Sequence, residues 1–550
     1  MIINKKFREF VFENSEGKRA AIYLTTFANG VFMALMMYAL SVGLDNYSEN
    51  SEVSLRATLM FTLSLGAYYF TQKYGGDISS ASIIKGISEL ELRVIDKLRR
   101  IDYDTFQTFS PELIYATIGG DKYTAIMAAR FLIPTMSAFV VVILTGLYLC
   151  TVSIPGALCV AAALIALIQI RGLLDAAIGE RGKDDSAATD KFTMSLNDVV
   201  GGFNELKMNR RKSDALFNHK VKTASEEKGK RILGTELYRT RSIVLEQAIL
   251  FLPLGLTLFV LPSFFTIDAQ DLVKIISVTL IVIWPAYTLV QFGPISTAAA
   301  DIIDKLKDFE AQLDKTELEP DINDPADYPS APEFTRIACR NIGFEYPKRS
   351  GDVKPFILKI EEFYLDKGRI VMMRGGNGSG KSTFMRLLAG LTRPSEGAIT
   401  VDGVSVTEIG DANYRSLFSL VMADFHLFDR FYGNESIDTD KLRKWAVQLG
   451  LDSKVIDKSE LPTISLSSGQ KKRMALLAAI MDNRPVLLLD EVAEDFDPVM
   501  REKYYREILP ELRAEGFTLF IISHDDRYYD IADCVLTMRE GGIVDLDSKE

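Results

Sequence analysis

The chain has 550 residues, of which 48% are hydrophobic, and its mean hydropathy is +0.10. That length allows two or more domains with large cores. The net charge of −11 argues against a nucleic-acid partner on bulk electrostatics. The four cysteines, Cys150, Cys159, Cys339 and Cys534, show neither metal-ligand nor disulfide spacing.

The apolar residues crowd into blocks before residue 295, and a membrane crossing needs about 20 of them. The predicted spans are Ala20–Leu44, Leu55–Phe70, Phe131–Cys150, Ile154–Ile170, Ile243–Phe265 and Leu272–Phe292. The third and fourth carry no charge and are broken only at Thr151–Pro155, which is typical of a helical hairpin that crosses and returns. A soluble core helix rarely needs so long an uncharged run. The second span has the weakest pattern, being short and rich in Thr, Ser, Gly and Tyr.

The distribution of Lys and Arg predicts the orientation of these spans. The expected outer loops, Asp45–Ser54, Thr151–Ser153 and Thr266–Asp271, contain neither residue, whereas the other side is rich in both. Both termini and everything after the sixth span are therefore expected in the cytoplasm. The expected localisation is the inner (plasma) membrane.

Two inner connections, Gln72–Arg130 and Arg171–Arg241, have helical periodicity and few breakers. We expect them to extend the spans well into the cytoplasm, with bends at Phe106–Gly119 and Gly201–Asn209. Ordinary solvated helix is the alternative for both bends.

Polar and aromatic residues in the spans are candidates for lining a cargo cavity: Asn29, Tyr38, Tyr68, Tyr69, Trp284, Tyr287 and Gln291. The alternative is stronger for each of them, because Tyr and Trp favour membrane interfaces and the others can pack helices together. Glu246 and Lys274 lie near opposite ends of their spans, where we expect their charged groups to snorkel.

Composition changes after the sixth span. A polar helix, Thr297–Leu313, leads into a proline-rich linker, and alternating strand patterns follow at Phe334–Cys339 and Phe356–Leu365. The predicted domains are residues 1–318, a linker at 319–332, and residues 333–550.

The run GGNGSGKST, Gly375 to Thr383, lies between an apolar strand pattern, Ile370–Met373, and a helical pattern, Phe384–Leu391. This context predicts a phosphate-binding loop and disfavours a Gly/Ser surface turn. Lys381 would reach the terminal phosphates and Ser382 would offer its hydroxyl to Mg²⁺. The expected nucleotide contacts are Gly375, Asn377, Gly378, Ser379, Gly380, Lys381, Ser382 and Thr383.

Three further motifs follow in order. Leu466–Gln470 (LSSGQ) precedes a helix, Lys471–Met481; a strand, Val486–Leu489, ends in Asp490-Glu491; and another strand, Leu519–Ile522, ends in Ser523-His524-Asp525. Asp490 at a strand end would hold Mg²⁺ through its water shell. Glu491 beside it can orient or deprotonate an attacking water.

Together with the phosphate loop, this set resembles the nucleotide-binding domain of ATP-binding cassette (ABC) transporters, whose signature LSGGQ is close to LSSGQ. The resemblance implies that Glu491 is the catalytic glutamate, that His524 contacts the γ-phosphate, and that Tyr346 stacks on adenine. A satisfied loop histidine and a core tyrosine are the alternatives for the last two. Asp497 matches the final aspartate of the segment after the glutamate.

The same resemblance implies that Ser467, Ser468, Gly469 and Gln470 complete the nucleotide site of a second subunit. A chain with one membrane half and one cassette must then pair, most simply with a second copy of itself in two-fold symmetry.

Two departures distinguish this sequence from most of the family. The first is Ala423, which stands where a glutamine normally touches Mg²⁺. Either Asp424 or a water substitutes for that glutamine, or hydrolysis is slower. The second is the segment after Glu491, which is the acidic run VAEDFDP. With the run GFNELKMNRRKSDALF, these strings resemble the cyclic-peptide exporter branch, which includes the syringomycin and pyoverdine-precursor transporters. That resemblance covers Phe10 to Val544 and implies that the bends near Ser110 and Asn204 are coupling helices.

The predicted fold is a membrane α-helical bundle of six spans, with long cytoplasmic extensions, fused to an α/β P-loop ATPase domain. The predicted function is ATP- and Mg²⁺-dependent export of a cyclic peptide, lipopeptide or siderophore precursor by a dimer embedded in membrane lipid. Lipid flipping or siderophore import by the same fold, and a non-transport membrane ATPase, remain as alternatives.

Overall fold

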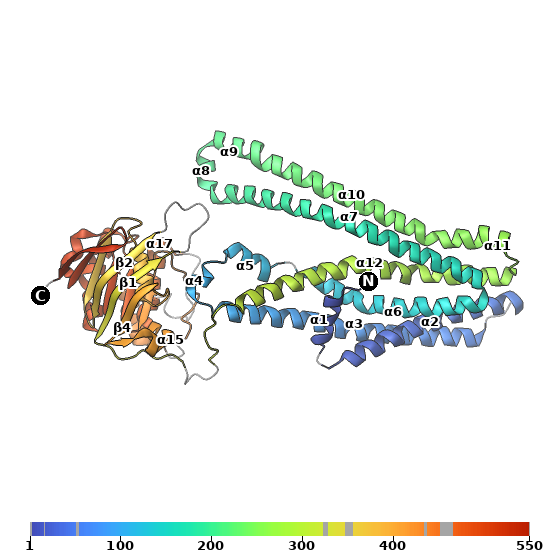
Figure 1. The fold of residues 1–550 in the computed structure, drawn as a ribbon, viewed down its shortest axis with the longest axis horizontal. Helices are drawn as coiled ribbons and strands as arrows, with labels where there is room; N and C mark the ends of the chain where they lie inside the picture. Colours follow the sequence, from blue (N-terminus) through green and yellow to red (C-terminus); the bar gives the residue numbers. More distant parts are fainter. Residues whose placement is uncertain are drawn as a thin grey trace. The chain divides into compact units, whose positions relative to one another are not determined.

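The computed structural model describes residues 3–548 apart from residues 16, 51–53, 121, 323–327, 347–355, 434–436 and 452–465. The chain forms two compact units (Figure 1). The helical unit comprises residues 1–99 and 110–315, and the α/β unit comprises residues 100–109 and 316–550.

Long helices dominate the helical unit. They are α1 (Lys5–Glu13), α2 (Arg19–Asn50), α3 (Leu55–Leu98), α5 (Pro111–Ile118), α6 (Tyr123–Val152), α7 (Ile154–Gly201), α8 (Phe203–Met208), α9 (Arg210–Leu216), α10 (Lys222–Gly255), α11 (Leu261–Phe264) and α12 (Ala269–Leu313). Figure 1 shows α7 and α10 running side by side as one pair, with α2, α3, α6 and α12 packed alongside one another. The predicted long helical extensions are confirmed, and helices end near both predicted bends, at Leu98 and Gly201.

Five helical stretches in the described part of the chain are long and apolar enough to cross a membrane: Arg19–Gly43, Leu113–Val152, Ile154–Leu174, Arg210–Phe264 and Ala269–Leu313. The second predicted span falls on α3, which is one continuous helix of 44 residues but is less apolar. Leu59, Leu63 and Phe70 of α3 are nevertheless exposed on its outer side, as expected of a helix that faces lipid. Six spans therefore remain a plausible count.

The turns between spans are shorter than predicted. The α6–α7 hairpin is confirmed: α6 ends at Val152, and the Ser153 hydroxyl caps α7 by accepting a hydrogen bond from the Gly156 N–H at 3.3 Å. The predicted outer loop Asp45–Ser54 is helical as far as Asn50, and residues 51–53 lie outside the described part of the chain.

The prediction that Glu246 snorkels is wrong. Its side chain is fully buried, with 0% exposure, between three helices. Arg171 on α7 donates from Nη1 to Glu246 Oε1 at 2.6 Å, and Gln291 on α12 donates from Nε2 to Oε2 at 2.8 Å. A charge inside an apolar bundle needs such partners, because water cannot reach it.

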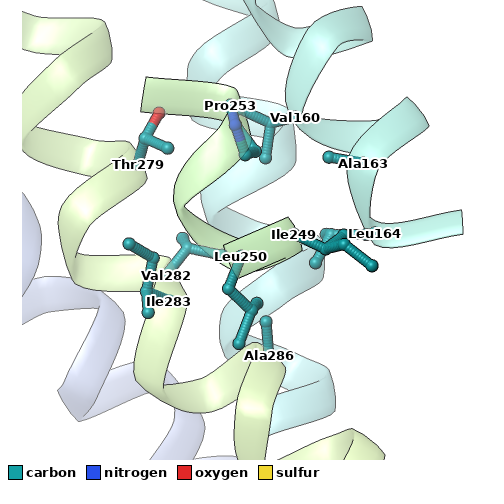
Figure 2. Close-up of a pocket in the computed structure, with 10 residues that line it drawn as sticks. All are labelled: Val160, Ala163, Leu164, Ile249, Leu250, Pro253, Thr279, Val282, Ile283 and Ala286. Atoms are coloured by element: carbon teal, nitrogen blue, oxygen red, sulfur yellow. The ribbon is translucent and has the colours of Figure 1, made fainter. Parts of the chain in front are cut away.

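A small apolar cavity lies between the same three helices, lined by residues of α7, α10 and α12 (Figure 2). Its volume of about 20 Å³ would admit little more than one water molecule. Thr279 is the polar residue of the lining, and its hydroxyl donates to the Ile275 carbonyl within its own helix. This cavity is a packing gap between helices and is too small for a peptide-sized cargo.

Asn29, a candidate for lining a cargo cavity, is a helix-packing residue in the structure. It is 1% exposed, and its side-chain amide donates to the Tyr68 carbonyl and the Thr71 hydroxyl of α3, each at 3.2 Å. Trp284 is 69% exposed on α12, near the middle of the predicted sixth span.

The α/β unit contains two sheets. The six-stranded sheet has the order β10 (Gly542–Ser548), β9 (Cys534–Arg539), β3 (Ile370–Gly375), β8 (Thr518–Ile522), β7 (Val486–Asp490) and β6 (Phe418–Val421), parallel except for the β10–β9 pair. The antiparallel sheet has the order β2 (Ile357–Asp366), β1 (Arg336–Glu345), β4 (Glu396–Val401) and β5 (Val404–Ser405). The helices are α4 (Tyr103–Phe106), α13 (Lys381–Leu388), α14 (Val406–Ile409), α15 (Asp411–Arg415), α16 (Thr439–Gln448), α17 (Ser468–Met481), α18 (Pro498–Lys503) and α19 (Leu509–Ala514).

The parallel sheet determines where the motifs meet. Every residue of β7 and β8 is buried, as expected of parallel strands covered on both faces. Because β3, β7 and β8 are parallel neighbours, their carboxyl ends lie at one edge of the sheet, where ligands bind in folds of this type. The phosphate loop, Asp490-Glu491 and His524 follow those three ends.

Residues 100–109, which contain α4, pack with the α/β unit although they lie between helices of the other unit along the sequence. The Glu319 N–H donates to the Arg100 carbonyl at 2.8 Å, and the Thr392 hydroxyl donates to Asp104 Oδ1 at 3.0 Å. Burial raises the pKa of Asp104. A boundary drawn along the sequence, such as the predicted linker at 319–332, assigns this segment to the helices instead.

Candidate nucleotide site

The phosphate loop connects β3 to α13 in a backbone shape that needs glycine. Gly378 and Gly380 have φ of 75° and 104°, in the left-handed region. A Cβ on Gly375 would lie 2.4 Å from the Met538 carbonyl oxygen, and one on Gly380 would lie 2.7 Å from the Phe356 ring. The predicted strand–loop–helix context is confirmed, with the helix beginning at Lys381, earlier than the predicted Phe384.

Lys381 is buried inside this loop, with 6% exposure. Its ammonium group donates to the carbonyls of Gly375 and Gly376 at 2.9 and 3.2 Å. A phosphate oxygen is a stronger partner for an ammonium group than a neutral carbonyl is. The side chain is thus held where an incoming phosphate can exchange for those carbonyls.

Asp490 and Ser382 form a pair that suits Mg²⁺. Asp490 is 2% exposed, and burial raises its pKa, while a hydrogen bond from Ser382 acts in the opposite direction. The described residues contain no group of three or more His, Cys, Asp or Glu placed to hold a metal ion. Mg²⁺ bound with a nucleotide needs only one or two protein carboxylates, since waters and phosphates supply the other ligands. The residues present fit that ion.

Glu491 and His524 meet at the ends of β7 and β8. Glu491 Oε1 and His524 Nε2 are 3.1 Å apart. The Glu491 backbone has φ of 51°, unusual for a residue with a side chain, and its N–H donates to the Ile522 carbonyl at 3.1 Å. A carboxylate can accept a proton from water, and the histidine is close enough to orient it.

A cleft of about 380 Å³ lies over the loop, lined by Tyr346, Phe356 and Gly378–Thr383. The Tyr346 hydroxyl is 3.0 Å from the Thr383 hydroxyl and accepts a hydrogen bond from Arg386 Nη1 at 3.3 Å. The ring centroids of Tyr346 and Phe356 are 6.4 Å apart. Two aromatic rings at a cleft beside a phosphate loop suit a stacked purine base.

The signature residues lie elsewhere. Among the described residues that line the cleft, none comes from Ser467–Gln470. Ser467 and Gln470 form a capping box at the start of α17: the Ser467 hydroxyl accepts from the Gln470 N–H, and the Gln470 side chain accepts from the Ser467 N–H. Asp497 likewise caps α18, accepting from the Val499 and Met500 N–H groups.

Three side chains beside this site were not predicted from the sequence. Phe356 lines the cleft, and Arg386 on α13 reaches the Tyr346 hydroxyl while its guanidinium lies 5.7 Å from the centroid of the Tyr103 ring. Lys472 on α17 donates to the Glu491 carbonyl at 2.9 Å. No pattern in the sequence singles out Lys472, because the residues three, four and seven positions after Lys471, Lys472 and Arg473 are all apolar.

Residues 358–494 match the model of the ABC transporter family. This part of the chain is an ATP-binding cassette. The matched residues contain the phosphate loop, Asp490-Glu491 and the signature.

Curated relatives extend the comparison. The ATP-binding protein SyrD of Pseudomonas syringae pv. syringae is 33% identical over 372 residues, which are 66% of this chain and 65% of SyrD. An ATP-dependent lipid A-core flippase of Neisseria meningitidis is 32% identical over 232 residues, 39% of this chain and 36% of the flippase. The chain thus matches less than two thirds of the length of either relative.

The whole architecture matches a solved structure, described as a bacterial Atm1-family ABC exporter with ATP bound. The TM-score is 0.69, with 16% sequence identity, over 97% of this chain and 96% of that one. The chain has an ABC exporter fold, so the predicted class, a helical membrane bundle fused to an α/β P-loop ATPase domain, is confirmed.

Proposed function

We propose that this chain is one half of an ATP-driven exporter, which works as a dimer and hydrolyses MgATP at the edge of the parallel sheet. The observation that carries the proposal is the meeting of Glu491 and His524, 3.1 Å apart, next to a phosphate loop. A structural nucleotide site would need the loop but not a carboxylate–histidine pair at the adjoining strand ends.

Each residue has a role that its contacts support. Lys381 exchanges its carbonyl partners for phosphate oxygens, and the glycine-rich backbone approaches the phosphates closely. Ser382 and Asp490 hold Mg²⁺, which neutralises charge on the phosphates when bound. Glu491 orients or deprotonates the attacking water, and His524 donates a hydrogen bond to the γ-phosphate. Tyr346, with Phe356, stacks on adenine.

A second copy of the chain is proposed as the partner. Helix α17 has 14 residues, and its amino-terminal end favours an anion. Because Ser467, Ser468, Gly469 and Gln470 do not line the cleft of their own chain, they are free to close the cleft of another. Two-fold symmetry would then build two equivalent composite sites.

The cargo is proposed to be a cyclic peptide, lipopeptide or siderophore precursor moved out of the cytoplasm across the inner membrane. The strings GFNELKMNRRKSDALF and VAEDFDP, and the identity with SyrD, support this branch. A lipid cargo is the second candidate, favoured by the relatives described as lipid A-core flippases.

The test is ATP-dependent uptake into inside-out vesicles that contain the full chain. Labelled cyclic lipopeptides and labelled lipid A are offered in parallel, with Glu491→Gln vesicles as the control. Peptide accumulation that needs ATP and Glu491 supports the proposal. Lipid movement alone selects the second candidate, and ATP hydrolysis stimulated by peptide without accumulation of either cargo indicates a non-transport ATPase.

A further inference from the structure

Lys472 is a buried lysine on the helix that begins with the signature motif. It is 6% exposed, and Met474, Ala475 and Leu476 beside it on α17 are buried as well. Lysine is rarely buried to this extent unless its charge is paired, because desolvating an ammonium group is costly. The neighbouring Lys471 is exposed. The chain therefore places one of two consecutive lysines inside the protein.

The partners of Lys472 all lie in the segment that begins at the proposed catalytic glutamate. Its ammonium group donates to the Glu491 carbonyl at 2.9 Å and lies 3.3 Å from Asp495 Oδ2 and 3.8 Å from Glu494 Oε2. Glu494 and Asp495 are two of the three acidic residues of VAEDFDP, one of the two departures from the family pattern. The buried cation accounts for that departure, because the acidic run neutralises its charge.

The backbone of Glu491 is held on both sides by these contacts. Its N–H donates to Ile522 of β8, and its carbonyl accepts from Lys472 of α17. Its φ of 51° is a left-handed conformation, which a non-glycine residue keeps only where surrounding contacts enforce it. The direction of the carboxylate towards His524 therefore depends on α17.

The same helix touches the acidic segment a second time. A Cβ on the signature glycine, Gly469, would lie 2.7 Å from the Asp495 carbonyl oxygen. Only glycine allows the start of α17 to approach that backbone so closely. The signature end of α17 and the acidic segment are thus packed directly against each other within one chain.

We propose that Lys472 is a positioning residue that connects the signature helix to the catalytic glutamate of its own chain. The inference rests on the proposed roles of Glu491 and of the signature residues. If Ser467–Gly469 contact the nucleotide of the partner, movement of α17 on nucleotide binding at that site is transmitted through Lys472 to Glu491. The two composite sites of the dimer then hydrolyse ATP cooperatively.

The first experiment measures ATP hydrolysis by the full-length protein carrying Lys472→Met, with Lys471→Met as the matched control. We expect Lys472→Met to lower kcat about tenfold, the size expected for loss of a charge-assisted hydrogen bond. KM for ATP should change by less than about twofold, because Lys472 does not line the cleft. The Hill coefficient for ATP should fall towards about one, and Lys471→Met should behave like the wild type.

Two further variants separate the charge of Lys472 from its hydrogen bond. Lys472→Arg keeps the charge and a donor and should recover most of kcat, whereas Lys472→Gln keeps a donor without charge and should recover less. The variant Glu494→Gln/Asp495→Asn removes the anionic partners. Combined with Lys472→Met, it should lower kcat no further than about twofold, because groups acting as a unit are not additive.

Wild-type kcat and cooperativity in Lys472→Met would overturn the proposal. It would equally be overturned by a matching loss in Lys471→Met, or by a rise in KM at constant kcat. If Lys472→Met does not fold, the ranking of the arginine and glutamine variants decides: equal activities contradict the role of the charge. Glu491→Gln is assayed alongside, and unchanged turnover there refutes the role of the glutamate rather than that of Lys472.

Discussion

The buried pair of Arg171 and Glu246 allows a quantitative prediction about the helical unit. Replacing Arg171 by methionine leaves the Glu246 carboxylate at 0% exposure, without its charged partner and with the hydrogen bond from Gln291. Breaking a buried ion pair in this way costs about 3–5 kcal/mol. Replacing both members, as in Arg171→Met/Glu246→Leu, removes both charges together and should bring stability back close to that of the wild type.

The expected change in melting temperature follows from the size of the unit. Each kcal/mol moves Tm by about 2 °C in units of this length, so Arg171→Met should lower Tm by about 6–10 °C. Lys274 serves as the control, since its pair with Asp271, at 3.7 Å, involves partly exposed side chains. Lys274→Met should therefore cost less than about 1 kcal/mol.

Intrinsic fluorescence can report on the helical unit alone. The chain has two tryptophans, Trp284 on α12 and Trp445 on α16 of the cassette. In a Trp445→Phe background, thermal unfolding in lipid nanodiscs is followed through Trp284. A Tm for Arg171→Met equal to that of Lys274→Met would show that the unpaired Glu246 carboxylate is not destabilising, as would a double variant no more stable than the single one.

Three further predictions concern the cassette. Burial raises the pKa of Asp490, and Mg²⁺ binds the ionised carboxylate. The Mg²⁺ concentration for half-maximal ATP hydrolysis should therefore rise as pH falls towards that pKa. A half-maximal Mg²⁺ concentration that does not change with pH would contradict this prediction. Tyr103→Ala removes the ring beside Arg386, so amide exchange in residues 100–109 should become about two- to fivefold faster while ATP turnover stays within about twofold; unchanged exchange contradicts this. Gly380→Ala introduces a Cβ 2.7 Å from the Phe356 ring at a φ of 104°, so the affinity for a fluorescent ATP analogue should fall at least about tenfold, and wild-type affinity would refute the glycine argument.

Local patterns in the sequence were sufficient to predict the strand and the phosphate loop of the cassette. The apolar run VLLLD predicts a buried strand because parallel strands are covered on both faces, and it is β7. The glycine-rich run predicts a phosphate loop because it lies between strand and helix patterns, and the structure shows that a side chain at Gly375 or Gly380 would clash. Such features depend on neighbours along the chain, so the sequence contains them.

Pairings between distant residues could not be predicted in the same way. Glu246 lies near the end of its span, so snorkelling was expected, but its partners Arg171 and Gln291 are 75 and 45 residues away along the chain. Residues 100–109 follow a helix of one unit yet pack with the other. Periodicity describes which face of a helix is apolar and does not identify what covers it.

The candidate site likewise contains residues that local patterns predict and residues that depend on distant pairings. Asp490 and Glu491 were predicted from a strand end and His524 from the family resemblance, whereas Lys472 was not predicted, because its role depends on α17 packing beside the Glu491 carbonyl. Asp497 matches a family position, and in the structure its carboxylate caps α18. Its role at the nucleotide therefore remains a prediction.

We propose that ATP is hydrolysed at Glu491 in a cassette that acts in pairs. The most direct measurement counts the ATP retained by purified Glu491→Gln protein in Mg²⁺, beside the hydrolysis rate of the wild type. We expect hydrolysis by the wild type and retention of about one intact ATP per chain, two per dimer, by the variant. Hydrolysis by Glu491→Gln at the wild-type rate, or failure of both proteins to bind ATP, would contradict it.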